Sequence, residues 1–144
     1  MAVCCTAGDL KYSKMVMMID DDGDTLEIYR LLVEKTEYAS HFITYSSAEI
    51  ALSFLAQSAK QSQPFPKYIL LDLIMPNQGG IDFIRSYEAA YGNSGRDTTI
   101  MILTSSVRDS DHQEALKYDS VTKVISKPLS KQLLIDLLAA SVVA

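Results

Sequence analysis

The feature of this chain that most constrains its fold is a regular alternation between short apolar stretches and longer stretches with helical periodicity. Each apolar stretch has the length and composition of a strand buried in a sheet. These stretches cover residues 15–19, 41–45, 68–71, 99–103 and 121–125. Because strand and helix alternate five times, the sequence predicts an α/β fold of the (βα)5 type. We expect a three-layer sandwich in which a parallel five-stranded sheet carries helices on both faces.

The predicted helices begin near residues that can cap them. The first begins near Asp24, with Asp22 or Asp24 as its cap. The second predicted helix follows residues 46–47 and loses its apolar spacing within the polar segment 57–63. Ser110 begins the fourth helix with the spacing of a capping box, and Ser130 can cap the fifth. These capping residues mark where the connections between strands and helices end, and the connections are short, as in an α/β domain.

Length and composition indicate one folded domain. The chain has 144 residues, and 48% of them are hydrophobic, which is enough for a substantial core. We expect residues 14–144 to form this domain and residues 1–13 to be a flexible N-terminal tail without the pattern of a secretory signal. The only cysteines, Cys4 and Cys5, are adjacent in this tail and are expected to stay reduced. Reduced thiols favour a cytoplasmic location.

Charge and hydropathy argue against two classes of partner. The net charge is −5, and the Lys and Arg residues form no block, whereas proteins bind nucleic-acid phosphates with a basic face. No apolar run approaches the roughly 20 residues that span a bilayer. We therefore expect neither direct nucleic-acid binding nor insertion into a membrane.

Polar side chains follow four of the predicted strands, each at the carboxyl end of its strand. The acidic run 20–22 follows the first strand, and Asp72 follows the third. Thr104 and Ser105 follow the fourth strand, and Lys127 follows the fifth. Because sites in open parallel sheets form beyond the carboxyl ends of the strands, we expect these side chains to make one site.

The acidic run suggests a metal site. Asp20, Asp21 and Asp22 would repel one another unless a cation lay between them, and their hard oxygen atoms suit Mg²⁺. The other interpretation is that these residues only cap the following helix, for which one Asp would be enough. Three consecutive carboxylates after a buried strand therefore favour Mg²⁺ binding.

Asp72 is the candidate reactive residue, because a carboxylate at the end of a buried strand is costly unless its charge is compensated. Kept ionised by Mg²⁺, it could attack a phosphoryl group and form an aspartyl phosphate; otherwise it would be a cap or a metal ligand. Thr104 and Ser105 offer hydroxyl groups, or are an ordinary polar strand end. Lys127 offers an ammonium group to a phosphate oxygen. Pro128 holds this lysine extended, through a trans or a cis bond.

Taken in order, these motifs resemble those of response-regulator receiver domains of two-component phosphorelay signalling, and the resemblance runs from Met15 to about Leu138. The matching motifs are Ile19-Asp20-Asp21-Asp22, Leu70 to Pro76 with Gly80, Leu103-Thr104-Ser105, and Ser126-Lys127-Pro128. The resemblance implies a flavodoxin-like fold with strand order 2-1-3-4-5. It also implies a protein that catalyses only its own phosphorylation and dephosphorylation and is not a turnover enzyme.

The resemblance implies a role for each residue on the acidic side of the site. Asp72 would accept a phosphoryl group from a sensor histidine kinase or a histidine phosphotransfer protein. Asp21 and Asp72 would bind Mg²⁺ directly, together with the backbone carbonyl of Ile74. Asp20 would act on the metal through water. The implied cofactor is thus Mg²⁺ alone.

The resemblance also implies a phosphate-binding and switching side. Lys127 and the hydroxyl of Thr104 would hold the phosphoryl oxygens, and Ser105 stands beside them where alanine is usual in the family. Val124 occupies the position of an aromatic residue that swings inward on activation. Any signal would therefore rest on an inward movement of Thr104 and on backbone shifts rather than on a ring.

Two further features set expectations about signal lifetime and output. Ile74 lies two residues after Asp72, at a position that tunes dephosphorylation in the family. An apolar side chain cannot orient an attacking water, so we expect slow autodephosphorylation. The chain ends soon after Leu138, so we expect output by contact with a downstream protein or by onward phosphotransfer. The face formed by the fourth helix, the strand at 121–125 and the last helix is a candidate homodimer surface.

Other functions remain open at this point. A receiver-like interaction module that works without phosphorylation is the main alternative. The complete set of site residues argues against it, and Val124 keeps it open. A phosphatase or phosphotransferase of the haloacid-dehalogenase type needs a second Asp two residues after its nucleophile, where this chain has Ile74. A flavin-binding flavodoxin needs a Ser/Thr/Gly-rich phosphate loop after the first strand, where this chain has the acidic run 20–22.

Overall fold

A computed structural model describes residues 14–75, 79–92, 97–105 and 109–143 of the chain. It has five parallel strands in the order β2-β1-β3-β4-β5, which confirms the predicted topology. The strands are β1 (Val16–Ile19), β2 (Phe42–Tyr45), β3 (Tyr68–Asp72), β4 (Thr99–Thr104) and β5 (Val121–Ser126). The predicted tail, residues 1–13, lies outside the described residues.

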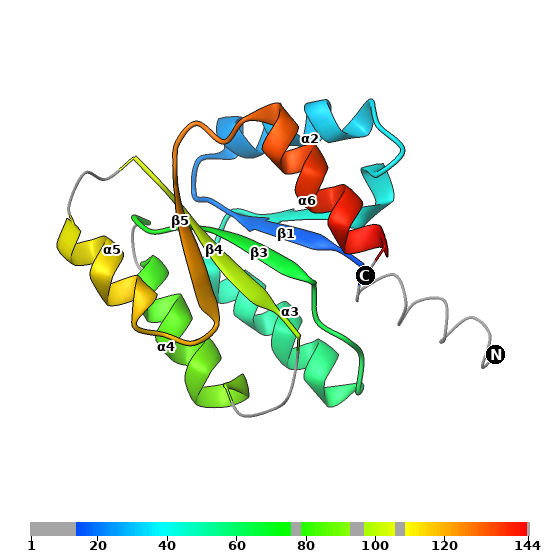
Figure 1. The fold of residues 1–144 in the computed structure, drawn as a ribbon. Helices are drawn as coiled ribbons and strands as arrows, with labels where there is room; N and C mark the ends of the chain where they lie inside the picture. The colour runs from blue at the N-terminus through cyan, green and yellow to red at the C-terminus, as the bar shows by residue number, and fades with distance from the viewer. Residues whose placement is uncertain (1–13, 76–78, 93–96, 106–108, 144) are drawn as a thin grey trace.

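The helices cover both faces of this sheet and complete the three layers (Figure 1). They are α2 (Gly23–Glu34), α3 (Ala48–Lys60), α4 (Gly80–Tyr91), α5 (Asp109–Leu116) and α6 (Lys131–Val143), with a 3-10 turn η1 (Ala39–His41) before β2. Helices α2 and α6 lie on one face, and α3, α4 and α5 lie on the other. Within the described residues, no helix is both long enough and apolar enough to cross a bilayer.

The core is divided into two clusters by the sheet. On β1, Val16 and Met18 face α2 and α6, whereas Met17 and Ile19 face α3 and α4. All four side chains are fully buried. Because successive residues of a strand point to opposite faces, a strand covered on both sides must be apolar at every position. This explains the unbroken apolar runs in the sequence.

The helix caps agree with the sequence and resolve one alternative. Asp22, rather than Asp24, caps α2: its carboxylate accepts the backbone N–H of Asp24 at 3.0 Å and the hydroxyl of Thr25 at 2.8 Å. The hydroxyl of Ser130 accepts the backbone N–H of Leu133 at 3.0 Å, in the first turn of α6. Helices α2 and α6 are therefore capped by side chains, whereas α4 begins after Gly79 without a side-chain cap.

Two helix boundaries differ from the sequence prediction. Helix α3 continues to Lys60 through the polar segment in which we expected it to fade, because one side of this segment still packs inward and buries Ser58. Helix α5 begins at Asp109, one residue before the predicted cap Ser110. The side chain of Ser110 lies outside the described residues.

Candidate functional site

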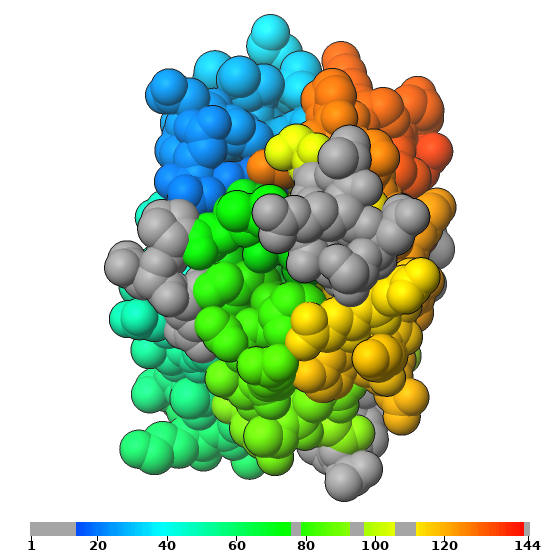
Figure 2. Space-filling view, turned by 90° about the vertical axis from the view of Figure 1, so that its left-hand side faces the viewer, coloured from blue at the N-terminus to red at the C-terminus, as the bar shows by residue number. Residues whose placement is uncertain are grey.

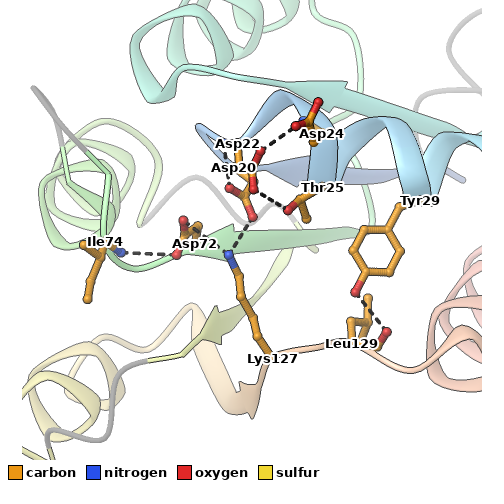
Figure 3. Close-up of polar contacts among 9 residues, drawn as sticks. All are labelled: Asp20, Asp22, Asp24, Thr25, Tyr29, Asp72, Ile74, Lys127 and Leu129. Atoms are coloured by element: carbon orange, nitrogen blue, oxygen red, sulfur yellow. Dashed lines mark hydrogen bonds and ion pairs between the residues drawn. The ribbon is translucent and has the colours of Figure 1, made fainter.

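The carboxyl ends of the strands bring the predicted site residues together at one end of the sheet (Figure 3). Asp20 directly follows β1, Asp72 ends β3, Thr104 ends β4, and Lys127 directly follows β5. Seen from this end of the molecule, the starts of α2 and α4 and the segment between β5 and α6 converge on one face (Figure 2). The strand order places β1 and β3 side by side at the centre of this face.

Lys127 connects the two buried carboxylates. Its Nζ lies 2.7 Å from Oδ2 of Asp20 and 3.4 Å from Oδ2 of Asp72. The carboxylates are almost inaccessible, with Asp20 1% and Asp72 6% exposed. A buried charge is tolerated only when it is paired and hydrogen-bonded, so this lysine supplies the charge compensation that the sequence required for Asp72.

Backbone N–H groups fix the other oxygen of each carboxylate. The N–H of Asp22 donates to Oδ1 of Asp20 at 2.9 Å, and the N–H of Ile74 donates to Oδ1 of Asp72 at 3.3 Å. Each carboxylate is therefore held between a backbone donor and the ammonium of Lys127, which fixes its orientation.

The charges at the site are not balanced. Burial and, after it, the nearby charge of Asp20 raise the pKa of Asp72 to about 6, against the opposing effects of Lys127 and the Ile74 N–H. Burial disfavours the charged form of Lys127, but its hydrogen bond to Asp20 and the charge of Asp72 prevail and raise its pKa. One ammonium thus serves two carboxylates, and an additional cation would stabilise the ionised form of Asp72.

The acidic residues can hold a divalent cation. Asp20, Asp21 and Asp72 each offer a carboxylate oxygen, and the three oxygens lie within 4.8 Å of one another. Asp21 is exposed and therefore faces solvent at the mouth of the site. Mg²⁺ prefers hard oxygen ligands and commonly takes one or two carboxylates while it keeps several waters, and the carboxylate oxygens of this set are ligands of that kind. The predicted role of the Ile74 carbonyl as a further ligand stays a prediction; its side chain is 60% exposed.

The predicted switch residues lie on the β4–β5 side of the site. Thr104 is buried, and its backbone carbonyl accepts the N–H of Lys127 at 2.9 Å. Ser105 is exposed. Val124 is half-buried and packs against the core cluster on the α3–α4 face. The bond between Lys127 and Pro128 is cis. Thr104 and Ser105 thus lie at the end of β4, next to the strand that carries Asp72, and Val124 lies on the neighbouring β5. Their roles in binding a phosphoryl group and in switching stay predictions.

Gly80 is needed for the packing of the segment behind Asp72. Its N–H donates to the carbonyl of Leu73 at 2.9 Å. A Cβ atom at Gly80 would lie 2.7 Å from the carbonyl oxygen of Asp72 and 2.7 Å from the Cα of Leu73. Both neighbours are backbone atoms that cannot rotate away, so only glycine lets α4 begin this close to the end of β3.

Tyr29 contributes a contact that sequence reasoning did not find. The sequence places Tyr29 only on the inner face of α2, by helical spacing. In the structure its hydroxyl donates to the carbonyl of Leu129 at 2.9 Å. Tyr29, Leu129 and Lys127 also line a cavity of about 320 Å³ beside the site. No local sequence signal could reveal this contact, because the two residues are 100 positions apart.

Comparison with known proteins gives one consistent result. The family described as "Response regulator receiver domain" matches residues 16–139. A curated relative, hybrid signal transduction histidine kinase D of Dictyostelium discoideum, is 31% identical over 104 residues, which cover 71% of this chain and 6% of the relative. The chain thus spans only a small part of that protein's length.

Solved structures agree with this result at the level of the fold. A two-component response regulator from Cytophaga hutchinsonii has a TM-score of 0.74 at 22% identity, covering 90% of this chain and 97% of that chain. One from Legionella pneumophila has a TM-score of 0.73 at 22% identity, covering 90% and 98%. Since the family match covers most of the chain and the fold and strand order agree with it, this protein belongs to the response regulator receiver domain family.

Proposed function

We propose that this protein is the phosphoacceptor of a two-component phosphorelay, and that Asp72 receives the phosphoryl group. One observation carries the proposal: the carboxylate of Asp72 is buried beside those of Asp20 and the exposed Asp21, with an ammonium 3.4 Å away. A carboxylate in this setting can act as a nucleophile towards phosphorus, while the cations beside it offset the charge of the incoming group.

Each residue of the site would have its own role in phosphoryl transfer. An oxygen of Asp72 forms the new bond to phosphorus as the bond between phosphorus and the donor nitrogen breaks. The donor ring, protonated on its other nitrogen before transfer, leaves as neutral imidazole. Lys127 would move its ammonium from the carboxylates to a phosphoryl oxygen. The hydroxyl of Thr104 would donate to another oxygen, with Ser105 beside it. The fixed backbone donor of Ile74 keeps Asp72 in one orientation throughout.

The acidic residues fit Mg²⁺ as the cofactor. Asp21 and Asp72 would bind it directly, together with the backbone carbonyl of Ile74, and Asp20 would act on it through water. The oxygens of the three carboxylates lie within 4.8 Å of one another. When bound, Mg²⁺ supplies positive charge next to the transferred phosphoryl group. The carboxylates are already within reach of a common ion, so binding needs no rearrangement of the strands that carry them.

The partners follow from the chemistry and from the relative. The matched curated protein is a hybrid histidine kinase, which supports a sensor histidine kinase or a histidine phosphotransfer protein as the donor. The output is contact with a downstream protein, and the face of α5, β5 and α6 is the candidate homodimer surface. We place the protein in the cytoplasm, and we assign it no catalytic turnover beyond its own phosphorylation and dephosphorylation.

An intact-mass experiment tests this function. The protein is incubated with Mg²⁺ and acetyl phosphate, and the product is analysed for an adduct of one phosphoryl group that is stable in acid and labile in base. We expect the adduct in the wild type, none in Asp72→Asn, and the full adduct in Asp136→Asn, which changes an exposed carboxylate on α6.

The controls separate the proposal from its main alternative. An adduct that persists in Asp72→Asn would assign the phosphoryl group to another residue. No adduct in the folded wild type would contradict the proposal and would favour an interaction module that works without phosphorylation. Omission of Mg²⁺ with a chelator is expected to abolish the adduct, which tests the cofactor separately from the acceptor.

A further inference from the structure

Tyr29 links α2 to the segment that carries Lys127 (Figure 3). Its hydroxyl donates to the backbone carbonyl of Leu129 at 2.9 Å. Both residues are buried, with Tyr29 7% and Leu129 4% exposed. Helix α2 begins directly after the acidic residues, so this bond connects the metal-binding side of the site to its phosphate-binding side.

The segment between β5 and α6 is short and held on both sides of Lys127. It runs only from Lys127 to Ser130. At its start, the N–H of Lys127 donates to the carbonyl of Thr104 at the end of β4. Tyr29 holds Leu129, two residues further on. The backbone that carries the lysine is thereby fixed between the sheet and α2.

Any role of Tyr29 beyond packing depends on its hydroxyl rather than on its ring. A phenylalanine ring would occupy the same place in the core cluster that Tyr29 shares with Leu129. A buried hydroxyl is unfavourable unless it is hydrogen-bonded. Burial raises the pKa of Tyr29, so the group is a protonated donor at neutral pH. The hydrogen bond to Leu129 offsets the free-energy cost of burying this hydroxyl.

We propose that Tyr29 is a positioning residue of this site, which acts through the carbonyl of Leu129 to hold Lys127 opposite Asp72. The inference rests on the proposed function of Asp72 as phosphoacceptor and adds a residue that touches no reacting atom. Loss of one net hydrogen bond of this kind changes an equilibrium by about threefold to tenfold. The fraction of molecules with a correctly placed Lys127 is expected to fall by this factor.

The first test measures the rate of phosphorylation. Wild type, Tyr29→Phe and Tyr68→Phe are incubated with acetyl phosphate at saturating Mg²⁺, and adduct formation is followed by intact mass. Tyr68 begins β3, at the far end of the sheet, and packs against the same core cluster as Tyr29. We expect Tyr29→Phe to react about threefold to tenfold more slowly and Tyr68→Phe to match the wild type. Equal rates in all three would overturn the inference and leave the role of Asp72 intact, whereas no adduct in the wild type would contradict the proposed function.

The second test does not depend on phosphorylation. An amine-reactive acylating reagent is applied in a short pulse at neutral pH, and the labelling of each lysine is measured by peptide mass spectrometry. The Lys127 side chain is 23% exposed and paired with Asp20, so it should label slowly in the wild type. Tyr29→Phe is expected to raise the labelling of Lys127 about threefold to tenfold and to leave Lys123, exposed on β5, unchanged.

The labelling pattern separates positioning from a purely structural role. If Tyr29 only stabilises the core, Tyr29→Phe will lower the melting temperature without changing the labelling of Lys127 relative to Lys123. That result would overturn the inference, as would an equal rise at every lysine, which reports opening of the whole domain. A selective rise at Lys127, together with slower phosphorylation of Tyr29→Phe, supports it.

Discussion

The two halves of the site are built differently. In the acidic half, Asp20, Asp72 and Lys127 are joined by ion pairs, and backbone donors fix the remaining carboxylate oxygens. In the switch half, Val124 is half-buried, and α5, the shortest of the α-helices that the structure describes, is held to α4 by exposed polar contacts. Nη2 of Arg85 lies 2.9 Å from Oε1 of Glu114.

This difference fits the tasks that we propose for the two halves. Phosphoryl transfer needs groups that are already in place, because misplacement of a reacting group by about 1 Å costs rate. A switch needs an element that can move at low cost, and such elements come from the least stable parts of a structure. Exposed ion pairs contribute at most about 1 kcal/mol, so contacts such as that of Arg85 hold α5 only weakly.

Lys127→Ala is expected to have the largest effect, because it removes the cation that joins the acidic half. We expect phosphorylation by acetyl phosphate to slow by about a hundredfold, since one fixed donor to the developing charge is lost. Intact-mass kinetics at saturating Mg²⁺ measures the rate. Lys123→Ala, at an exposed position of β5, is the matched control and should react as the wild type does. Similar rates in both variants would show that Lys127 serves folding alone.

Gly80→Ala tests how rigid the backbone behind Asp72 is. A Cβ atom would meet backbone atoms of Asp72 and Leu73 at 2.7 Å, so we expect the free energy of unfolding to fall by about 1–3 kcal/mol. Urea denaturation measures this change. Gly23→Ala is the control, because a Cβ atom there meets nothing within 4 Å. If both variants were equally stable, the close approach of α4 to β3 would not be a constraint.

Ile74→Asn should shorten the life of the phosphorylated form. The side chain of Ile74 is 60% exposed beside Asp72 and offers no polar atom to a water molecule. We expect an amide there to orient an attacking water and to shorten the half-life of the adduct about tenfold. The adduct is isolated from acetyl phosphate, and its loss is followed by intact mass. Ile50→Asn, at an exposed position of α3, should leave the half-life unchanged; an unchanged half-life in Ile74→Asn would refute the idea.

Asp72→Asn should make the metal-free protein more stable in a pH-dependent way. Burial raises the pKa of Asp72 to about 6 in the folded protein, whereas the unfolded chain has the ordinary value near 4. The folded state therefore disfavours the ionised carboxylate, and this cost is fully present above pH 6 and absent below about pH 4. We expect a higher melting temperature for Asp72→Asn at pH 7.5 and no difference from the wild type near pH 4. If the melting temperature of Asp72→Asn also exceeded that of the wild type near pH 4, the charge of Asp72 would not be the cause of the gain.

Arg85→Ala should have the smallest effect on stability. Its contacts to Glu114 and Asp82 involve side chains that are 40% to 58% exposed, so we expect a change of at most about 1 kcal/mol in urea denaturation. The hydrogen exchange of α5 should rise nonetheless, because Arg85 also donates to the hydroxyl of Tyr118. A large loss of global stability with no local change in α5 would show that the switch half is as firmly built as the acidic half.

Much of the fold could be predicted because the relevant signals are local. The apolar runs give the strands, and their order along the chain places Asp20, Asp72, Thr104 and Lys127 at carboxyl ends. Parallel pairing then brings these ends together, so the sequence alone predicts that they meet. The arrangement of side chains around a common point follows from this topology rather than from any single motif.

The parts that could not be predicted depend on tertiary contacts. The hydrogen bond from Tyr29 to Leu129 joins residues that approach only when α2 and α6 pack on the same face. The choice of Asp22 over Asp24 as cap depends on where the chain leaves β1, and the continuation of α3 to Lys60 depends on the packing of Ser58. Local propensity cannot decide such cases, because several residues have similar intrinsic preferences.

The ion pair between Asp20 and Lys127 has a consequence for protein synthesis. The two residues are 107 positions apart, and Lys127 leaves the ribosome after every other residue of the site. A nascent chain can display its acidic residues while it still lacks the lysine that pairs with them. The ion pairs of the site can therefore form only after β5 and the residue that follows it have been synthesised.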